Sequence, residues 1–134
     1  MRREGGAMSA GTLSRSERIA RLNDRERQAM GLVCVAVATQ GFRALSETDQ
    51  SRVRELVETF DAFTPDNDPY DERDFGAIYQ DGEGRWTTTR PARPVETVFW
   101  KIDAYDRDLQ FGSDDPANPA VTRRVLTIML ASEY

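Results

Sequence analysis

The sequence predicts an α+β fold: a small mixed or antiparallel sheet of three to four strands packed against about three helices. Three segments carry apolar residues at helical spacing, and short β-branched segments lie between turns rich in Gly, Pro and Asp. The 134 residues are enough for one hydrophobic core. We therefore expect a single α+β domain over residues 14–134, preceded by a flexible, Gly-rich leader over residues 1–13.

Two N-terminal segments are expected to form helices. The first begins at an N-cap on Ser14 or Ser16 and ends near Met30. The second follows Ser46, which together with Asp49 resembles a capping box in which an acid replaces the usual Glu or Gln. Its buried side is expected to consist of residues at helical spacing: Val53, Leu56, Val57 and Phe60.

The C-terminal segment is expected to form a third helix. Asn118 can cap it, and Pro119 fits its first turn, where no backbone N–H is needed. Four apolar residues would form its buried side: Val121, Val125, Ile128 and Met129.

Strands are expected between these helices. Leu32 to Thr39 is apolar and β-branched, which predicts a buried strand. Phe75 to Tyr79 leads into an Asp-Gly-Glu-Gly turn, after which Arg85 to Thr89 could return as the partner strand. Val95 to Asp103 alternates between apolar and polar residues. Its apolar face consists of Val98, Trp100 and Ile102.

Composition excludes several kinds of chemistry. The chain has no histidine and one cysteine, Cys34, which removes Ser-His-Asp and Cys-His nucleophiles and the usual zinc ligand sets. The apolar neighbours of Cys34 favour a buried structural thiol. No apolar run approaches the roughly 20 residues of a membrane helix, and Met1 to Thr12 lacks the hydrophobic centre of a secretory signal. We expect a cytoplasmic protein without a membrane partner.

The net charge of −5 is unevenly distributed. Residues 1–27 contain seven arginines and four acids, a balance of +3, so residues 28–134 carry −8. An acidic body repels nucleic acid and suits basic proteins or cations. Only Arg15 to Arg27 has the sign that DNA binding needs, so direct nucleic-acid binding is not expected.

Acidic residues gather in two loops. Asp61 to Asp74 holds six acids and one arginine in fourteen residues, and the second loop runs from Asp103 to Asp108 and on to Asp114 and Asp115. The strands at 75–79 and 97–103 would bring both loops to one end of the sheet if they were neighbours. Lys101 and Asp103 lie on one strand face and could form an ion pair. The arginines of the loops, Arg73 and Arg107, are expected to neutralise the acids beside them.

Three interpretations of these loops remain open. Their Asp and Asn residues could be turn formers that bond their own backbone, parts of a binding surface, or members of a metal or catalytic site. The candidate binding residues are Asp66, Asn67, Asp68, Tyr70, Asp74, Lys101, Asp103, Tyr105, Asp106 and Asp108. A divalent cation, if bound, would use oxygen ligands from Asp66, Asp68, Asp74, Asp103 and Asp106. The calcium-hand pattern fails because its glycine and terminal acid are missing. No catalytic residue is assigned.

Several of these segments resemble one bacterial family. The matching stretches are Ile19 to Asp24, Asp66 to Tyr70, Asp74 to Ala77, Phe99 to Asp106 and Gly112 to Tyr134. They are similar to the family named domain of unknown function 3768, which is typical of alphaproteobacteria and their plasmids. The resemblance implies no established activity and suggests a role connected with mobile elements. Family members often carry a histidine where this chain has Arg73, and its absence weighs against catalysis.

These observations predict a small acidic, non-enzymatic binding protein that engages a basic protein surface through its acidic loops, as an anti-defence protein or DNA mimic would. The alternative is a metal-dependent hydrolase or nuclease that uses clustered aspartates. A third possibility is a subunit of a larger assembly, in which Trp86, Phe99 and Phe111 form an exposed apolar contact. No cofactor is expected apart from the divalent cation of the alternative, and the sequence does not fix the oligomeric state.

Overall fold

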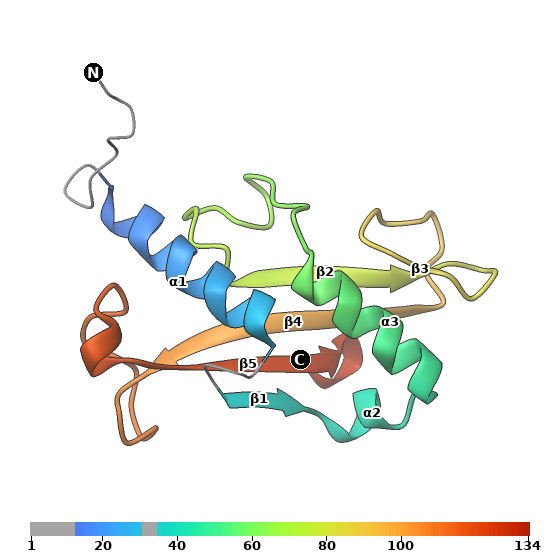
Figure 1. The fold of residues 1–134 in the computed structure, drawn as a ribbon. Coiled ribbons are helices and arrows are strands. Elements are labelled where there is room, and N and C mark those ends of the chain that lie inside the picture. Colours follow the sequence, from blue (N-terminus) through green and yellow to red (C-terminus); the bar gives the residue numbers. More distant parts are fainter. Residues whose placement is uncertain (1–12, 31–34) are drawn as a thin grey trace.

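The computed structural model describes residues 13–30 and 35–134, whose elements form two layers (Figure 1). One layer is a five-stranded mixed sheet of order β1-β5-β4-β2-β3. The strands in chain order are β1 (Val35–Ala38), β2 (Phe75–Gln80), β3 (Trp86–Thr87), β4 (Glu96–Tyr105) and β5 (Arg123–Leu130). The α+β class and the mixed sheet are confirmed, with five strands in place of the expected three to four. Most of the predicted leader, together with Cys34, lies outside the described residues.

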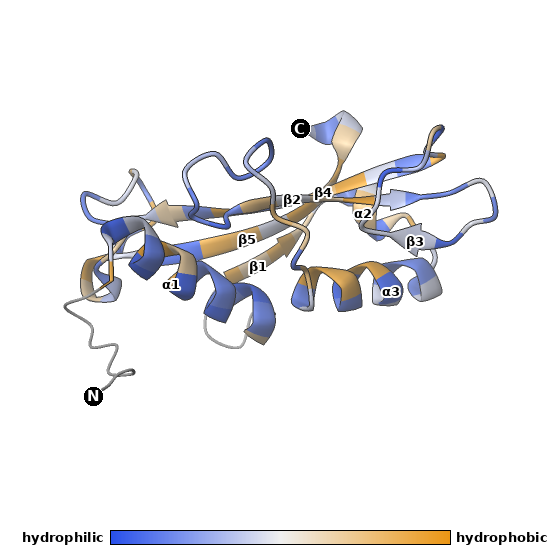
Figure 2. Ribbon diagram, turned by 90° about the horizontal axis from the view of Figure 1, so that it is seen from above, coloured by the Kyte–Doolittle hydropathy of each residue, from blue (hydrophilic) through white to orange (hydrophobic). Residues whose placement is uncertain are grey.

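The second layer consists of helices on one face of the sheet (Figure 2). Its members are α1 (Arg15–Ala29) and α3 (Glu47–Glu58), while the short α2 (Gln40–Arg43) follows β1. Both longer helices were predicted to within about two residues. None of the described helices has the length and apolar character needed to cross a membrane.

The two predicted helix starts differ in how they are capped. In α1 the Ser14 hydroxyl accepts a hydrogen bond from the Glu17 N–H, and the Glu17 carboxylate accepts one from the Ser14 N–H. In α3 the Ser46 hydroxyl accepts from the Asp49 N–H at 3.0 Å, but the Asp49 carboxylate accepts from the Trp86 indole at 3.0 Å. The capping box expected at Ser46 is therefore replaced by a bond that joins α3 to β3.

The predicted C-terminal helix is wrong. Only Pro119–Val121 form a short 3-10 turn, capped by the Asn118 side chain, and the chain then enters β5. β5 pairs in parallel with β1 and antiparallel with β4, so its backbone groups find partners on both sides. Leu126 and Ile128 alternate toward the core and are 0% and 4% exposed. The pairing on both edges outweighs the helical spacing of the same residues and supplies the fifth strand.

The first strand is also less buried than expected. Within the predicted segment from Leu32 to Thr39, the described strand is β1, and it lies at the edge of the sheet. Val37 is 44% exposed, whereas the neighbouring Ala38 packs against the core. The strands β2, β3 and β4 agree with their predicted segments, and the face of β4 formed by Val98, Trp100 and Ile102 is buried as expected.

The core lies between the sheet and the helices. Trp100 is fully buried and packs edge-to-face against Phe60 and Phe63, with ring centroids 5.3 and 6.0 Å away. Trp86 is buried in the same core with 6% exposure. The predicted exposed apolar contact of Trp86, Phe99 and Phe111 is therefore not formed as proposed, and Phe111 alone of the three is largely exposed, at 71%.

The opposite face of the sheet is covered in part by the C-terminal segment (Figure 2). Tyr134 follows the 3-10 turn Ala131–Glu133 and packs against Phe75 and Phe99, with centroid separations of 6.0 and 5.5 Å. Phe99 is thus a member of an aromatic cluster within its own chain.

Candidate functional site

The two acidic loops lie at the same end of the sheet (Figure 1). β2 and β4 are antiparallel neighbours, with Phe75 opposite Lys101. The loop before β2 and the loop after β4 therefore lie at the same end of these two strands. The candidate residues of the two loops are therefore gathered at one end of the molecule.

Several candidate residues shape the first loop. The Asn67 side chain accepts from the Thr64 N–H at 2.8 Å and donates to the Ala62 carbonyl at 2.9 Å. The Asp68 carboxylate is buried and accepts from the N–H groups of Glu72 and Arg73, both at 3.0 Å. These bonds hold a segment in which Asp71 and Arg73 have positive φ angles of 58° and 54°. Asn67 and Asp68 are therefore turn formers as well as binding candidates.

The second loop is built in the same way. Its Asp106 carboxylate accepts from the Gln110 N–H at 3.0 Å, and the Asp106 N–H donates to the Phe111 carbonyl at 2.8 Å. Asp115 accepts from the Ala117 N–H at 3.3 Å and lies 3.8 Å from the Arg15 guanidinium. Exposed residues surround these turns in the two loops: Asp66, Tyr70 and Asp108.

Lys101 and Asp103 form an ion pair on the strand between the loops. Their charged atoms are 2.8 Å apart, and the side chains are 34% and 37% exposed. The hydrogen bond that Lys101 donates to the Asp103 carboxylate raises the pKa of Lys101. Tyr105 lies two residues further along β4 and is partly buried. The predicted ion pair is therefore present. Because both side chains are partly exposed to water, it contributes little to stability.

Carboxylates from both loops influence one another electrostatically. Burial raises the pKa of Asp74, and repulsion from Asp68 and Asp103 raises it further. Burial followed by repulsion from Asp74 also raises the pKa of Glu72. Among residues 13–30 and 35–134, however, no group of three or more His, Cys, Asp and Glu side chains could hold a metal ion. Asp66 and Asp106 are not among the acids that shift the pKa of Asp74.

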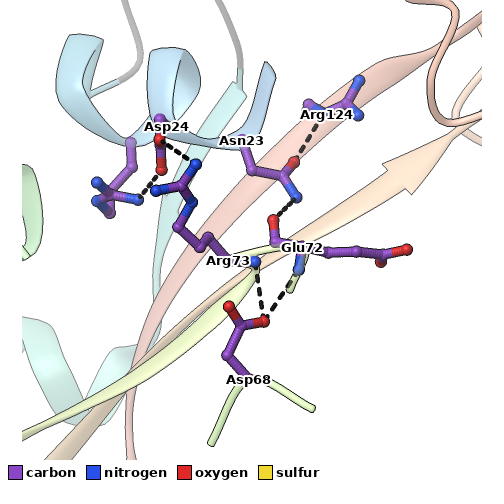
Figure 3. A network of polar contacts seen from close by, with 7 residues as sticks. Asn23, Asp24, Asp68, Glu72, Arg73 and Arg124 are labelled. Atoms are coloured by element: carbon purple, nitrogen blue, oxygen red, sulfur yellow. Dashed lines mark hydrogen bonds and ion pairs between the residues drawn. The ribbon is translucent and has the colours of Figure 1, made fainter. Parts of the chain in front are cut away.

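A polar network that the sequence did not reveal fastens the loops to the rest of the fold (Figure 3). Arg124 on β5 is 5% exposed, and its Nε donates to the Asn23 side-chain oxygen at 2.7 Å. Asn23 in turn donates to the Glu72 carbonyl at 2.9 Å, and Arg124 also donates to the Pro116 carbonyl. One chain of bonds therefore links α1, β5 and both loops. Its sequence signal is faint: Asn23 follows Ile19 by four residues on the buried side of a helix.

Arg73 has a different partner from the one expected. It pairs with Asp24 of α1 at 3.3 Å rather than with an acid of its own loop (Figure 3). Asp24 also pairs with Arg27 at 3.0 Å. Arg27 is 3% exposed, and its guanidinium lies 5.4 Å from the ring centroid of Trp100 and 5.5 Å from that of Phe63. Arg73 thus fixes the loop to the first helix. Arg107 makes no ion pair with any described residue.

The first loop and the start of α1 enclose a groove with a volume of about 550 Å³. Its lining includes Glu17, Asp61, Asp68 and Asp71, against one basic residue, Arg73. We call this the acidic groove. Because Arg73 is already paired with Asp24, the acids of the groove exceed the positive charge available to neutralise them.

The comparisons with known proteins identify a family but no function. No curated protein and no solved structure matches the chain. A family match covers residues 38–133, from the end of β1 to the C-terminal turn, and includes both acidic loops but not α1. As this range is well over half of the sequence, the chain belongs to the family described as "Protein of unknown function (DUF3768)".

Proposed function

We propose that the protein is a cytoplasmic, non-catalytic binding protein that engages the basic surface of a protein partner through its acidic loops. The acidic groove is the observation that carries this proposal. Asp61 and Asp71 are exposed at its lining, and neither makes an ion pair with a described residue. Such carboxylates keep their charge available for an incoming lysine or arginine.

The rigidity of the first loop supports binding. Asp68 accepts two backbone hydrogen bonds, and Arg73 is anchored to α1, so the loop does not have to be ordered when a partner arrives. Tyr70 directly precedes Asp71, which lines the groove, and it is 78% exposed. An exposed tyrosine among charges offers the partner an aromatic contact of the kind enriched in interfaces.

The charge distribution suggests which partners fit. Residues 28–134 carry a net charge of −8, and a protein cleft that normally holds phosphates would attract such a surface. We place the partner among nucleic-acid-handling proteins, such as a restriction nuclease, in line with the predicted setting on mobile elements. Charge mimicry of DNA is then the mode of binding.

Nuclease inhibition tests the proposal. The full chain is mixed with a restriction endonuclease and its DNA at increasing salt concentrations. We expect inhibition that weakens as salt rises, because screening reduces attraction between exposed charges. The double variant Asp61→Asn/Asp71→Asn should lose inhibition, whereas Glu47→Gln/Glu55→Gln, which removes the same charge from exposed positions on α3, should retain it. No inhibition, salt-independent inhibition or equal loss in both variants would contradict the proposal.

The repulsion that Asp68 and Asp103 exert on Asp74 is the observation behind one competing function, a metal-dependent hydrolase or nuclease. Calorimetric titration with Mg²⁺, Mn²⁺ and Ca²⁺ separates the two. Binding that disappears in Asp74→Asn and persists in Asp61→Asn/Asp71→Asn would support the competing function. The absence of binding at millimolar concentrations would leave the binding protein as the better account.

A further inference from the structure

A second cavity has the opposite charge. It lies between the C-terminal half of α1, the start of β5 and the second loop, and it has a volume of about 270 Å³. Four arginines line it together with one acid and a threonine: Arg25, Arg107, Arg123, Arg124, Glu26 and Thr122. We call it the arginine pocket. It is a local concentration of positive charge in a chain whose total charge is −5.

The guanidinium groups of this pocket have no ion-pair partner among the described residues. In the part of the chain that the structure describes, none of the four makes an ion pair, although arginines elsewhere do so: Arg15, Arg27, Arg52, Arg73 and Arg85. Arg25, Arg107 and Arg123 are exposed. Their charges are therefore open to a ligand that enters the pocket.

Arg124 gives the strongest argument for an anionic ligand. It is only 5% exposed, and its described acceptors are neutral, the Asn23 side-chain oxygen and the Pro116 carbonyl. Burial lowers the pKa of Arg124, with Glu26 and Glu72 acting in the opposite direction from beyond ion-pair distance. A buried cation without a close anion is costly, and a bound anion would offset that cost. Its two hydrogen bonds orient the guanidinium before any ligand arrives.

Glu26 defines a second requirement for the ligand. Its Oε2 atom is buried and has no hydrogen-bond partner among the described residues. A carboxylate oxygen in this position needs a donor. Because Glu26 also lines the pocket, a ligand with a hydroxyl group near its charged end can donate to this side chain, whereas a purely anionic ligand meets only its repulsion.

We infer that the arginine pocket binds a small sugar phosphate. The arginine forks match the geometry of a phosphate group, and a sugar hydroxyl donates to Glu26 as ribose hydroxyls do to acidic residues in nucleotide sites. The volume lies just below the roughly 300–1,000 Å³ typical of pockets for larger ligands, which suits a sugar phosphate better than a dinucleotide. The site uses none of the residues that line the acidic groove, so it is independent of the proposed function.

Calorimetry on the full chain with three probes tests this inference. We expect saturable binding of ribose 5-phosphate, at least tenfold weaker binding of inorganic phosphate, and no binding of ribose. Arg107→Gln/Arg123→Gln should weaken ribose 5-phosphate binding at least tenfold, and both positions are exposed, so the fold should be retained. Glu26→Ala should reduce the preference for ribose 5-phosphate over phosphate, because it removes the acceptor of the sugar hydroxyl, whereas the repulsion that it removes acts on both anions.

The matched control is Arg43→Gln/Arg52→Gln, which removes two exposed arginines outside the pocket and should bind like the unmodified chain. Equal loss in this control would mean general charge attraction and would overturn the inference. So would the absence of saturable ribose 5-phosphate binding. Equal affinities for phosphate and ribose 5-phosphate would overturn the assignment of a sugar hydroxyl to Glu26.

Discussion

Gly76 lies in β2 against the indole of Trp100. A Cβ atom at this position would come within 2.7 Å of the Phe60 ring and would also collide with Trp100 Nε1. Both rings are almost fully buried and pack against each other, so neither can move aside without disturbing the core. Because residue 76 has no side chain, the Trp100 indole can lie over β2 at this position.

Gly76→Ala should consequently destabilise the protein. Overpacking of a filled core typically costs about 1–3 kcal/mol in the free energy of unfolding, which urea denaturation measures. Gly82→Ala is the matched control, because its Cβ would meet no atom within 4 Å and its φ is not in the left-handed region. Similar urea midpoints for the two variants would contradict this account of Gly76.

Asp74 gives a residue-scale prediction on pH. Its pKa is raised by burial and then by Asp68 and Asp103, so the folded state holds the proton more tightly than the unfolded state. The favourable contribution of the protonated group is complete below the unfolded pKa of about 3.9 and is lost as the pH rises through the folded pKa. Asp74→Asn should therefore raise the melting temperature at pH 7, and the gain should shrink as the sample is acidified.

Asp81 provides the opposite sign as a control. A hydrogen bond from the Arg85 backbone N–H is the main cause that lowers its pKa. Its contribution is present above the unfolded pKa and disappears as the pH falls through the folded pKa. Asp81→Asn should lower the melting temperature at pH 7 and have little effect in acid. Shifts of the same sign for both variants would refute the assignment.

At the scale of elements, local signals predicted α1, α3 and the β2–β4 strands well. Ser14 and Ser46 mark helix starts by capping chemistry, which is readable from a few neighbouring residues. The helix predicted where β5 lies is wrong because two patterns coexist in this segment. Helical spacing is satisfied by Val121, Val125, Ile128 and Met129, and the alternation of a strand is satisfied by Leu126 and Ile128. The choice depends on β1, about 90 residues earlier, which local spacing does not show.

The candidate site shows the same division. The turn-forming Asp and Asn residues of the loops can be predicted from the sequence, because their bonds run to backbone groups a few residues away, as in Asp106 and Asn67. The bond between Arg124 and Asn23 joins residues 101 positions apart, and the arginine pocket combines a helix, a loop and a strand. The helical spacing of this segment predicts a helix, and a helix would not place Arg124 on the inner face of a sheet.

The bond between Asp49 and Trp86 gives a prediction at the element scale. It joins the first turn of α3 to the two-residue strand β3, and Trp86, which donates the bond, is buried. Asp49→Ala should reduce the free energy of unfolding by about 1.5–3 kcal/mol, the usual range for a hydrogen bond to a charged group, as measured in urea. Asp49→Asn retains an acceptor for the indole and should lose less. Equal losses would show that the bond is not what matters.

At the scale of the whole molecule, the two ends of the family match meet. β1 and β5 are parallel neighbours, and the segment after β5 folds back toward α2. The Glu133 carboxylate accepts hydrogen bonds from the Thr39 hydroxyl at 2.6 Å and from the N–H groups of Gly41 and Leu130 at 2.9 Å each. A Cβ on Gly41 would lie 2.7 Å from this carboxylate, so the glycine makes room for the contact.

Glu133 should therefore stabilise the edge of the sheet, because it joins the C-terminal segment to the end of β1 and the start of α2. The hydrogen bond from Thr39, followed by that from Leu130, lowers the pKa of Glu133, so its contribution is present above the unfolded pKa and is lost as the pH falls through the folded pKa. Glu133→Ala should lower the melting temperature at pH 7 and speed amide hydrogen exchange in β1, with the difference from the unmodified chain closing in acid. Ser132→Ala, at the neighbouring exposed position, should change neither measurement. If Glu133→Ala instead left hydrogen exchange in β1 unchanged at pH 7, the parallel pairing with β5 would hold that edge without the Glu133 carboxylate. The strand hydrogen bonds remain when the carboxylate is removed.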